Sequence, residues 1–292
     1  MSAAPLAPGP TSKAGVSSVP TRYVTLAYGD AGAVYAQASM LLVSLLAHAP
    51  APCELVVVTD RPERLEWLRD AVRIEMVTAA KLERWRGPSP FSMRQKIEVA
   101  AAMMPASGAM VLLDADVIAA RPLQPFVGQV ATGARFMHTR EYELGSSRRQ
   151  GNRRLWHALE GRSFGSWQFR AEDSMWNSGV VAVPAADAEL FDDALALYDA
   201  MAAVGIRHFA TEQLVVGAVL QRNGHVGEAR EWFTHYWGNK QAFTAEIERR
   251  LTSARGAQLT PDAAAREFLG NPILLPAEAR PTKLQKLRRW FS

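Results

Sequence analysis

The stretch Ala109-Met110-Val111-Leu112-Leu113-Asp114-Ala115-Asp116 runs from an apolar segment straight into two carboxylates separated by one small residue. The apolar part predicts a buried strand at residues 109–113. Unpaired aspartate is costly to desolvate, and residues i and i+2 of a strand project to the same side. A divalent cation such as Mg²⁺ or Mn²⁺, which prefers oxygen ligands, is the simplest partner for two such groups. The pattern predicts a metal-bridged diphosphate at the end of a sheet strand; the alternative is that both aspartates cap the following turn.

Strands and helices alternate through the first half of the chain. Strands are predicted at residues 23–28, 54–59, 73–78 and 109–113, and helices at residues 35–48, 64–72 and 91–104. This alternation predicts an α/β fold with a doubly wound, mostly parallel sheet. Ligands of such sheets bind beyond the carboxyl ends of the strands, where Asp30, Asp60 and the two later aspartates fall.

The second half is less regular. A strand is predicted at residues 179–183, helices at residues 189–203 and from Thr211, and a short strand at residues 232–236. Residues 139–169 show no clear periodicity, and a long irregular segment of this kind more often has a function than serves as a linker.

Charge and composition exclude several classes of protein. Of the 33 lysines and arginines, five lie in residues 280–292, which contain no acid, so the rest of the chain is close to neutral and a nucleic-acid partner is disfavoured. Cys53 is the single cysteine, which excludes an intramolecular disulfide and suits a reducing cytoplasm. No apolar run is long enough to span a membrane. We expect a disordered leader at residues 1–20, one domain at residues 21–270 and a basic amphipathic tail at residues 271–292.

Four further segments carry polar groups suited to chemistry, each with a plainer alternative. Asn177-Ser178-Gly179 can bind sugar hydroxyls or form an ordinary turn, and Thr211-Glu212-Gln213 can contact a ligand or cap a helix. The segment from His235 to Lys240 combines a metal-capable imidazole with a cation. Lys96 can support a phosphate or be a solvated helical lysine.

The order of these residues resembles that of GT-A fold glycosyltransferases, in particular the glycogenin-like, family-8 group that includes bacterial lipopolysaccharide galactosyl- and glucosyltransferases. The resemblance spans roughly residues 22–240. It rests on the following motifs: Thr25-Leu26-Ala27 with Asp30 and Tyr35, Lys96, Asp114-Ala115-Asp116, Asn177-Ser178-Gly179-Val180, Glu212-Gln213, and His235, Gly238 and Lys240. Two motifs differ from the family pattern, which has Asp-Gln at Glu212-Gln213 and Pro-Trp after Lys240.

The resemblance implies a single GT-A-type domain, with a nucleotide-binding N-terminal half and an acceptor-side C-terminal half. Asp114, Asp116 and His235 are the implied ligands of Mn²⁺ (or Mg²⁺). The implied donor-binding residues are Thr25, Ala27, Asp30, Tyr35, Lys96, Asn177, Ser178, Gly238 and Lys240. By the same resemblance the first four line the nucleoside pocket and Lys240 meets the diphosphate. Asn177 and Ser178, together with Glu212 and Gln213, face the transferred sugar. The candidates for assisting the oxocarbenium-like state are Gln213, Glu212 and Asp173, unless the leaving phosphate itself accepts the proton.

The implied partners are a nucleotide-sugar donor, UDP-linked by resemblance, and a glycan or lipid-linked acceptor in bacterial surface-polysaccharide or lipopolysaccharide assembly. Arginines between Arg140 and Arg154 can clamp an acidic acceptor or belong to a solvated loop. The tail either binds the inner face of the cell membrane or packs on the domain. Two alternatives stay open: a noncatalytic nucleotide-sugar-binding or scaffold protein, and a nucleotidyltransferase, for which the glycine-rich phosphate loop is missing.

Overall fold

The computed structural model describes residues 20–87 and 91–278, so the predicted leader, except for residue 20, and residues 279–292 of the predicted tail lie outside the described residues. Its centre is a seven-stranded sheet in the order β10-β6-β9-β4-β1-β2-β3. The strands are β1 (Thr21–Ala27), β2 (Cys53–Thr59), β3 (Arg73–Met76), β4 (Ala109–Leu113), β6 (Arg135–Glu143), β9 (Ser174–Pro184) and β10 (Val226–Glu228).

The sheet is mostly parallel, which confirms the predicted fold class. β1 pairs in parallel with β2 and β4, β2 pairs with β3, and β10 pairs with β6. β9 is the exception, because it runs antiparallel to both β4 and β6. Within β9 every residue except the last is buried, as expected for a central strand covered on both faces.

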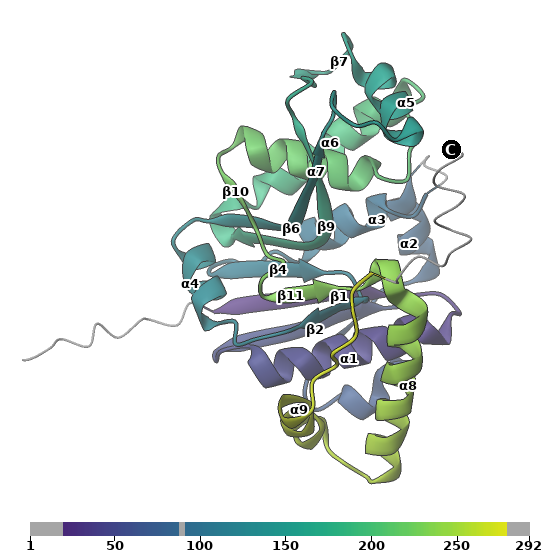
Figure 1. Ribbon diagram of the computed structural model, residues 1–292, viewed down its shortest axis with the longest axis vertical. Coiled ribbons are helices and arrows are strands. Elements are labelled where there is room, and N and C mark those ends of the chain that lie inside the picture. Colours follow the sequence, from purple (N-terminus) through teal and green to yellow (C-terminus); the bar gives the residue numbers. More distant parts are fainter. Residues whose placement is uncertain (1–19, 88–90, 279–292) are drawn as a thin grey trace, which may run out of the picture.

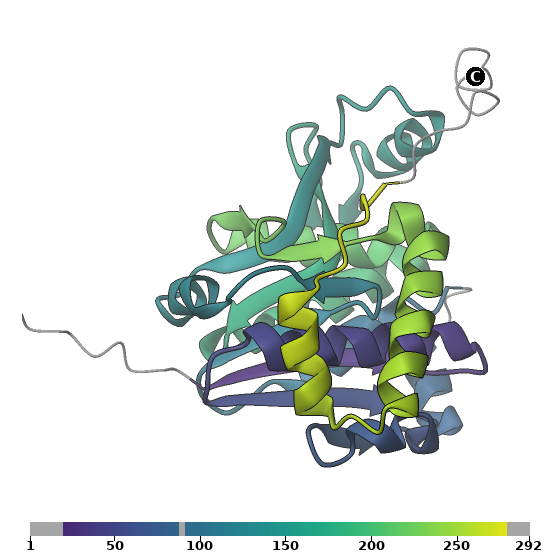
Figure 2. The same ribbon diagram turned by 60° about the horizontal axis from the view of Figure 1, so that its bottom comes forward.

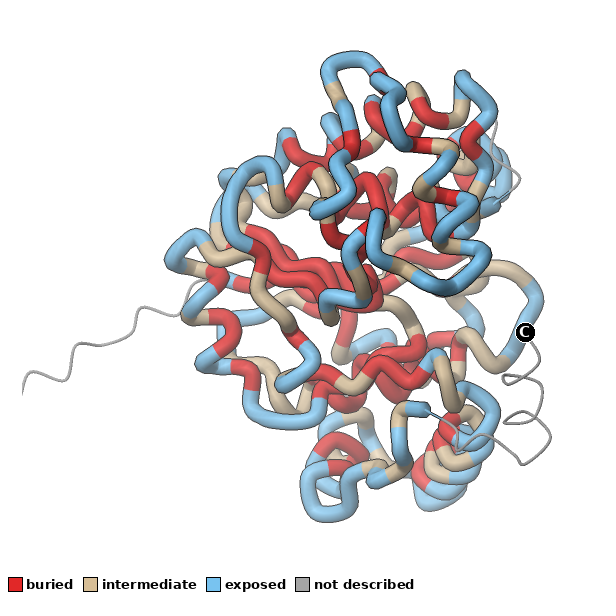
Figure 3. The backbone as a smooth tube through the Cα atoms, turned by 45° about the horizontal axis from the view of Figure 1, so that its top comes forward, coloured by how far each residue is buried: buried red, intermediate tan, exposed pale blue. Residues whose placement is uncertain are grey.

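Helices cover both faces of the sheet (Figure 1). Successive strand residues point to opposite faces, and Tyr23 and Val24 of β1 accordingly belong to two different hydrophobic cores. The core around Tyr23 includes residues of α1 (Gly32–His48), α8 (Lys240–Gly256) and α9 (Pro261–Gly270). The core around Val24 includes residues of α2 (Ala79–Arg86), α3 (Arg94–Met103), α6 (Glu189–Ala203) and α7 (Thr211–Arg222). In Figure 2, α8 and α9 lie across α1, and Figure 3 shows the buried strands between the two helical layers.

Two sequence predictions need correction. The helix expected at residues 64–72 is a shorter 3₁₀ helix, η1 (Pro62–Leu68). The stretch 139–169 is not irregular, because it contains the end of β6, the helix α5 (Gln150–Leu159) and a hairpin of β7 (Ser163–Phe164) and β8 (Trp167–Gln168). In β6 only Phe136 and Met137 are buried, so the strand lacks the apolar alternation by which strands are found.

Besides α5, four helices of the described residues were not predicted, namely α2, α4 (Gln124–Ala131), α8 and α9. Within residues 20–87 and 91–278, none of the helices combines the length and the apolarity that a membrane span needs.

Candidate functional site

Asp114, Asp116 and His235 come together at the carboxyl end of β4, although His235 is far from the aspartates in sequence. One ligand atom of each lies within 4.8 Å of the others. His235 Nε2 is 3.4 Å from Asp116 Oδ1 and 3.9 Å from Asp114 Oδ2. A small antiparallel ribbon of β5 (Val117–Ala119) and β11 (Phe233–His235) produces this proximity, because it pairs His235 with Val117, the residue after Asp116.

The ring of His235 is held in one orientation by Asn177. His235 Nδ1 lies 2.9 Å from Asn177 Oδ1, and the same oxygen accepts the backbone N–H of Gly179 at 3.0 Å. An amide oxygen only accepts hydrogen bonds, so Nδ1 carries a ring proton and Nε2 is the ring nitrogen directed at the carboxylates. Nε2 is buried and has no hydrogen-bond partner among the described residues. A histidine that faces two carboxylates in this orientation has the geometry of a metal ligand.

Gly179 is the residue that makes room for this ring. A Cβ atom at position 179 would lie 2.2 Å from His235 Nδ1, closer than side chains approach one another. The backbone of Gly179 also fixes Asp114, whose N–H donates to the Gly179 carbonyl at 2.9 Å. Gly179 therefore joins β9 to both sides of the cluster.

The donor set fits a divalent cation, since two carboxylates and an imidazole suit Mn²⁺ or Mg²⁺ with open positions. Burial by itself raises the pKa of Asp116, but the neighbouring His235 and Lys240 outweigh it and hold that pKa well below its usual value. The carboxylate is therefore ionised at neutral pH. Lys240 Nζ lies 2.8 Å from Asp116 Oδ2, and its side chain is 53% exposed, so its ammonium group is open to solvent and to a ligand.

Lys96 is buried, so the interpretation as a solvated helical lysine is wrong. Its Nζ lies 2.7 Å from Asp114 Oδ1 and 3.7 Å from Glu212 Oε1, and it donates to the Ser178 carbonyl at 2.6 Å. Burial by itself lowers the pKa of Lys96, but the charges of Asp114 and Glu212 outweigh it and raise that pKa. Lys96 is thus the buried counter-charge of two carboxylates.

The residues predicted to face the sugar fall into two groups. Glu212 and Ser178 are buried and bonded to each other at 2.8 Å. Asn177 and the half-buried Gln213 share a partner that the sequence analysis missed, Glu141, whose two carboxylate oxygens accept from their amides at 3.3 and 3.4 Å. No sequence signal marked Glu141, because it lies in the part of β6 that was read as irregular.

The turn alternative for residues 177–179 does not hold, and of the capping alternative for residues 211–213 only the acid in the first helical turn, Glu212, is confirmed. Asn177, Ser178 and Gly179 lie within β9 rather than in a turn. Helix α7 begins at Thr211 as predicted, but its N-cap makes no side-chain hydrogen bond, and the Thr211 hydroxyl donates to the carbonyl of His208.

The predicted nucleoside-binding residues surround the end of β1. Thr25 and Ala27 are buried in that strand, and the Thr25 hydroxyl has no partner among the described residues. Tyr35 donates to the Gly29 carbonyl at 2.7 Å and to Asp60 at 3.1 Å, while Asp60 also accepts the Gly29 N–H. Asp60 therefore orders this turn.

Three other predicted positions are more peripheral. The exposed Asp30 carboxylate forms an ion pair with Arg61. Gly238 lies against Glu278 and Ala277, in the segment that follows α9. The Asp173 carboxylate accepts the N–H of Arg170 at 2.8 Å and lines a separate cavity, and among the described residues it has no bond to the metal-ligand cluster.

His138 is a second residue that the sequence analysis missed. Its ring meets that of His235 edge to face, with centroids 5.3 Å apart, and its Nε2 lies 3.2 Å from the Phe233 carbonyl. Burial and the neighbouring His235 lower the pKa of His138 to about 4, so this ring is neutral at neutral pH. It forms an uncharged wall behind the metal-ligand cluster.

Comparison with known proteins gives similarity at the level of structure only. No family model matches the chain, and no curated protein matches it. Among solved structures, mouse xyloside xylosyltransferase 1 in its apo form is similar, with 16% sequence identity, 72% of this chain and 85% of that chain covered, and a TM-score of 0.48. At this identity and TM-score the likeness assigns neither an activity nor a substrate.

Proposed function

We propose that the protein is a metal-dependent glycosyltransferase of the GT-A type, which moves a sugar from a nucleotide sugar to a glycan or lipid-linked acceptor. The observation that carries the proposal is His235 Nε2, which is buried without a hydrogen-bond partner among the described residues and directed at the carboxylates of Asp114 and Asp116. Apolar packing gives no reason to bury these groups together, whereas a cation-bound diphosphate at the end of β4 does.

In this proposal Asp114, Asp116 and His235 hold Mn²⁺, with Mg²⁺ as the second choice. The bound cation would stabilise the negative charge that builds on the diphosphate as the bond to the anomeric carbon breaks. Lys240 is half exposed beside Asp116 and would contact the same diphosphate. Thr25, Ala27 and Tyr35 would line the nucleoside pocket.

Gln213 is our choice for the residue that contacts the transferred sugar. Glu212, its neighbour, is enclosed by Lys96 and Ser178 and so is directed away from solvent. Asp173 lies in a different cavity. The half-buried amide of Gln213, held by Glu141 at the edge of the site, is therefore the group best placed to meet the sugar ring.

The finer assignments rest on the resemblance of the sequence motifs. They are a UDP-hexose donor, retention of anomeric configuration, and a role in bacterial surface-polysaccharide or lipopolysaccharide assembly at the inner face of the cell membrane.

The test is a panel of nucleotide sugars, with and without Mn²⁺, scored by thermal shift and by donor hydrolysis. We expect one UDP-sugar to raise the melting temperature and to be hydrolysed slowly, in both cases only with Mn²⁺. A manganese-dependent shift without hydrolysis or transfer would favour the noncatalytic sugar-nucleotide-binding protein. Absence of any metal-dependent response to nucleotides would overturn both.

A further inference from the structure

A second cavity, of about 280 Å³, lies beside the start of β9. Its wall is formed by the β7–β8 hairpin, the turn at residues 170–173 and the last two turns of α7. Both β9 and α7 continue from this cavity to the metal-ligand cluster. Glu212 and the cavity residue Arg222 are ten positions apart on α7, which corresponds to about 15 Å at the rise of an α-helix. That span is within reach of a short extended oligosaccharide.

The cavity presents two arginines, Arg170 and Arg222, that form no ion pair with any described residue. Arg222 is preorganised, because its guanidinium carbon lies 3.5 Å from the centre of the Trp167 ring. A stacked guanidinium keeps its N–H groups in a fixed plane, which matches the geometry of a carboxylate or phosphate. The cavity therefore contains cationic donors that lack an internal acceptor.

The remaining lining groups are suited to hydroxyl groups. Asp173 accepts the Arg170 N–H through one carboxylate oxygen. Gln221 is anchored by its amide nitrogen, which donates to the carbonyls of Ser174 and Gly217. The second carboxylate oxygen of Asp173 and the amide oxygen of Gln221 are left as acceptors, so the site can receive sugar hydroxyls next to an anion.

The wall of the cavity is held firmly. The backbone of Gly145 donates to the Ala171 carbonyl at 2.9 Å, and a Cβ at position 145 would lie 2.7 Å from Ala171 Cβ. Leu144 N–H donates to the Asp173 carbonyl, also at 2.9 Å. The turn at residues 170–173 is thereby fixed against the end of β6.

The surrounding lobe adds uncompensated positive charge. Residues 144–173, which include the turn of the cavity wall, contain six arginines and three acids, namely Glu160, Glu172 and Asp173. Elsewhere arginines such as Arg94 and Arg135 are neutralised by carboxylates. Arg140, which the sequence analysis grouped with this lobe, is also neutralised, by Glu143. The field around the cavity thus favours an anionic ligand.

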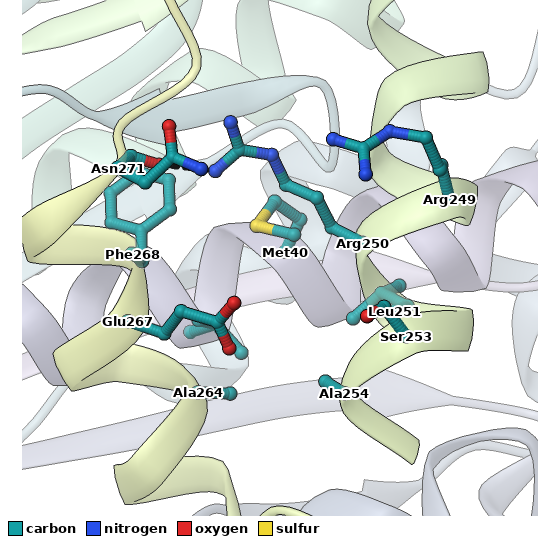
Figure 4. Close-up of a pocket in the computed structure, with 11 residues that line it drawn as sticks. Met40, Arg249, Arg250, Leu251, Ser253, Ala254, Ala264, Glu267, Phe268 and Asn271 are labelled. Carbon is teal, nitrogen blue, oxygen red and sulfur yellow. Dashed lines mark hydrogen bonds between the residues drawn. The ribbon is translucent and has the colours of Figure 1, made fainter. Parts of the chain in front are cut away.

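The cavity drawn in Figure 4, of about 70 Å³ between α1, α8 and α9, also contains arginines, but these have partners within the protein. Arg250 reaches across it toward Asn271 and is bonded to that carbonyl, and both Arg249 and Arg250 are paired with Glu246. Its cations are therefore occupied.

We propose that the cavity of Arg170 and Arg222 is an acceptor subsite for a sugar residue that carries a carboxylate or a phosphate. The inference deepens the proposed glycosyltransferase function, and the assignment of this subsite to the acceptor rests on that function. The two guanidinium groups receive the anion, and Asp173 and Gln221 receive hydroxyl groups of the same residue.

Binding of three probes to the full chain tests the proposal by saturation-transfer NMR and calorimetry. The probes are glucuronate, glucose 6-phosphate and glucose. We expect both anionic sugars to bind at least ten times more tightly than glucose, and Arg170→Ala/Arg222→Ala to remove this preference. The matched control is Arg84→Ala/Arg266→Ala, which changes two exposed helical arginines without ion pairs among the described residues and should keep it. A preference for one anionic probe alone would identify the anion as carboxylate or phosphate.

Equal binding of the three probes to the wild-type chain, or an unchanged preference in the Arg170→Ala/Arg222→Ala variant, would overturn the subsite. Ala218→Leu, which adds volume to the lining, should weaken both anionic probes and serves as a second variant. Manganese-dependent binding of UDP is measured on the same samples. It should be unchanged in every variant, so its absence would count against the proposed function and not against the subsite.

Discussion

His235 Nδ1 lies 2.9 Å from the side-chain oxygen of Asn177, which also accepts the Gly179 N–H. This contact fixes both the tautomer and the direction of the imidazole, and it leaves Nε2 directed at Asp114 and Asp116. Asn177 is predicted to face the transferred sugar, and its side-chain oxygen in addition orients a candidate metal ligand.

Removing this contact should weaken metal binding. Groups that orient a metal-ligating histidine typically contribute a factor of about 10–100 to affinity. We therefore expect Asn177→Ala to raise the Kd for Mn²⁺ by that factor in calorimetry, while Asn177→Asp, which keeps an acceptor oxygen, stays close to wild type. In ¹⁵N spectra of the metal-free protein, Nδ1 of His235 should carry the proton in the wild type and lose this preference in Asn177→Ala. An unchanged ring spectrum would contradict the orienting role.

Gly179→Ala should displace the His235 ring. The new methyl group would lie 2.2 Å from His235 Nδ1, so either the imidazole ring or strand β9 must move. We expect a lower melting temperature and loss of Mn²⁺ binding. The matched control is Gly128→Ala in α4, where an added Cβ meets nothing within 4 Å and helix propensity improves. If both variants bind Mn²⁺ like the wild type, the close approach at Gly179 has no role in the site.

Asp116→Asn should abolish catalysis and preserve the fold. The substitution keeps the shape of the side chain and removes the charge that faces His235 and Lys240. Loss of one such electrostatic contact typically costs about 3–4 kcal/mol of activation free energy, or roughly 10²–10³ in rate. Donor hydrolysis with Mn²⁺ measures the effect, and the exposed Asp70→Asn is the control. Near-normal turnover in Asp116→Asn would remove its assigned role.

Lys96→Met should destabilise the protein, because it leaves Asp114 and Glu212 without their buried counter-charge. Breaking a buried ion pair from one side typically costs about 3–5 kcal/mol. Urea unfolding should show this loss, and Lys96→Met/Glu212→Gln should recover part of it. The half-exposed Lys240→Met, which also removes a lysine partner from an aspartate, should cost about 1 kcal/mol or less. Equal losses in the two lysine variants would argue against the buried pairing of Lys96.

Glu246 on α8 should contribute acid-sensitive stability. Hydrogen bonds from Arg249 and Arg250 lower its pKa to about 2, so folding favours the ionised form. Its contribution is complete above the unfolded-state pKa near 4.5 and is lost as pH falls toward 2. Because solvent reaches these groups, we expect a loss on the order of 1 kcal/mol for Glu246→Gln at pH 7. The difference from the wild type, measured by urea unfolding, should shrink steadily between pH 4.5 and pH 2.

The sequence predicted the fold class and the first half of the sheet well. Apolar runs such as residues 54–59 and 109–113 form strands that are covered on both faces. A continuous apolar run is typical of such a central strand, so these strands could be found from the sequence. Residues 135–143 escaped detection because β6 is half exposed and polar, so only its pairing with β9 makes it a strand. The 3₁₀ helix η1 was mistaken for a longer α-helix because its buried residues Leu65 and Leu68 are three positions apart, a spacing that both kinds of helix share.

Local sequence also determined that Asp114 and Asp116 follow a buried strand, since their position depends only on where the apolar run ends. Whether a third ligand joins them depends on the β5–β11 ribbon, which brings His235 to Asp116 across more than a hundred residues. Tertiary structure alone likewise decided that Lys96 is a buried counter-charge and that Asp173 belongs to another cavity. Spacing along a chain sets the direction of neighbouring side chains, but the partner of a buried charge is set by which strands and helices pack around it.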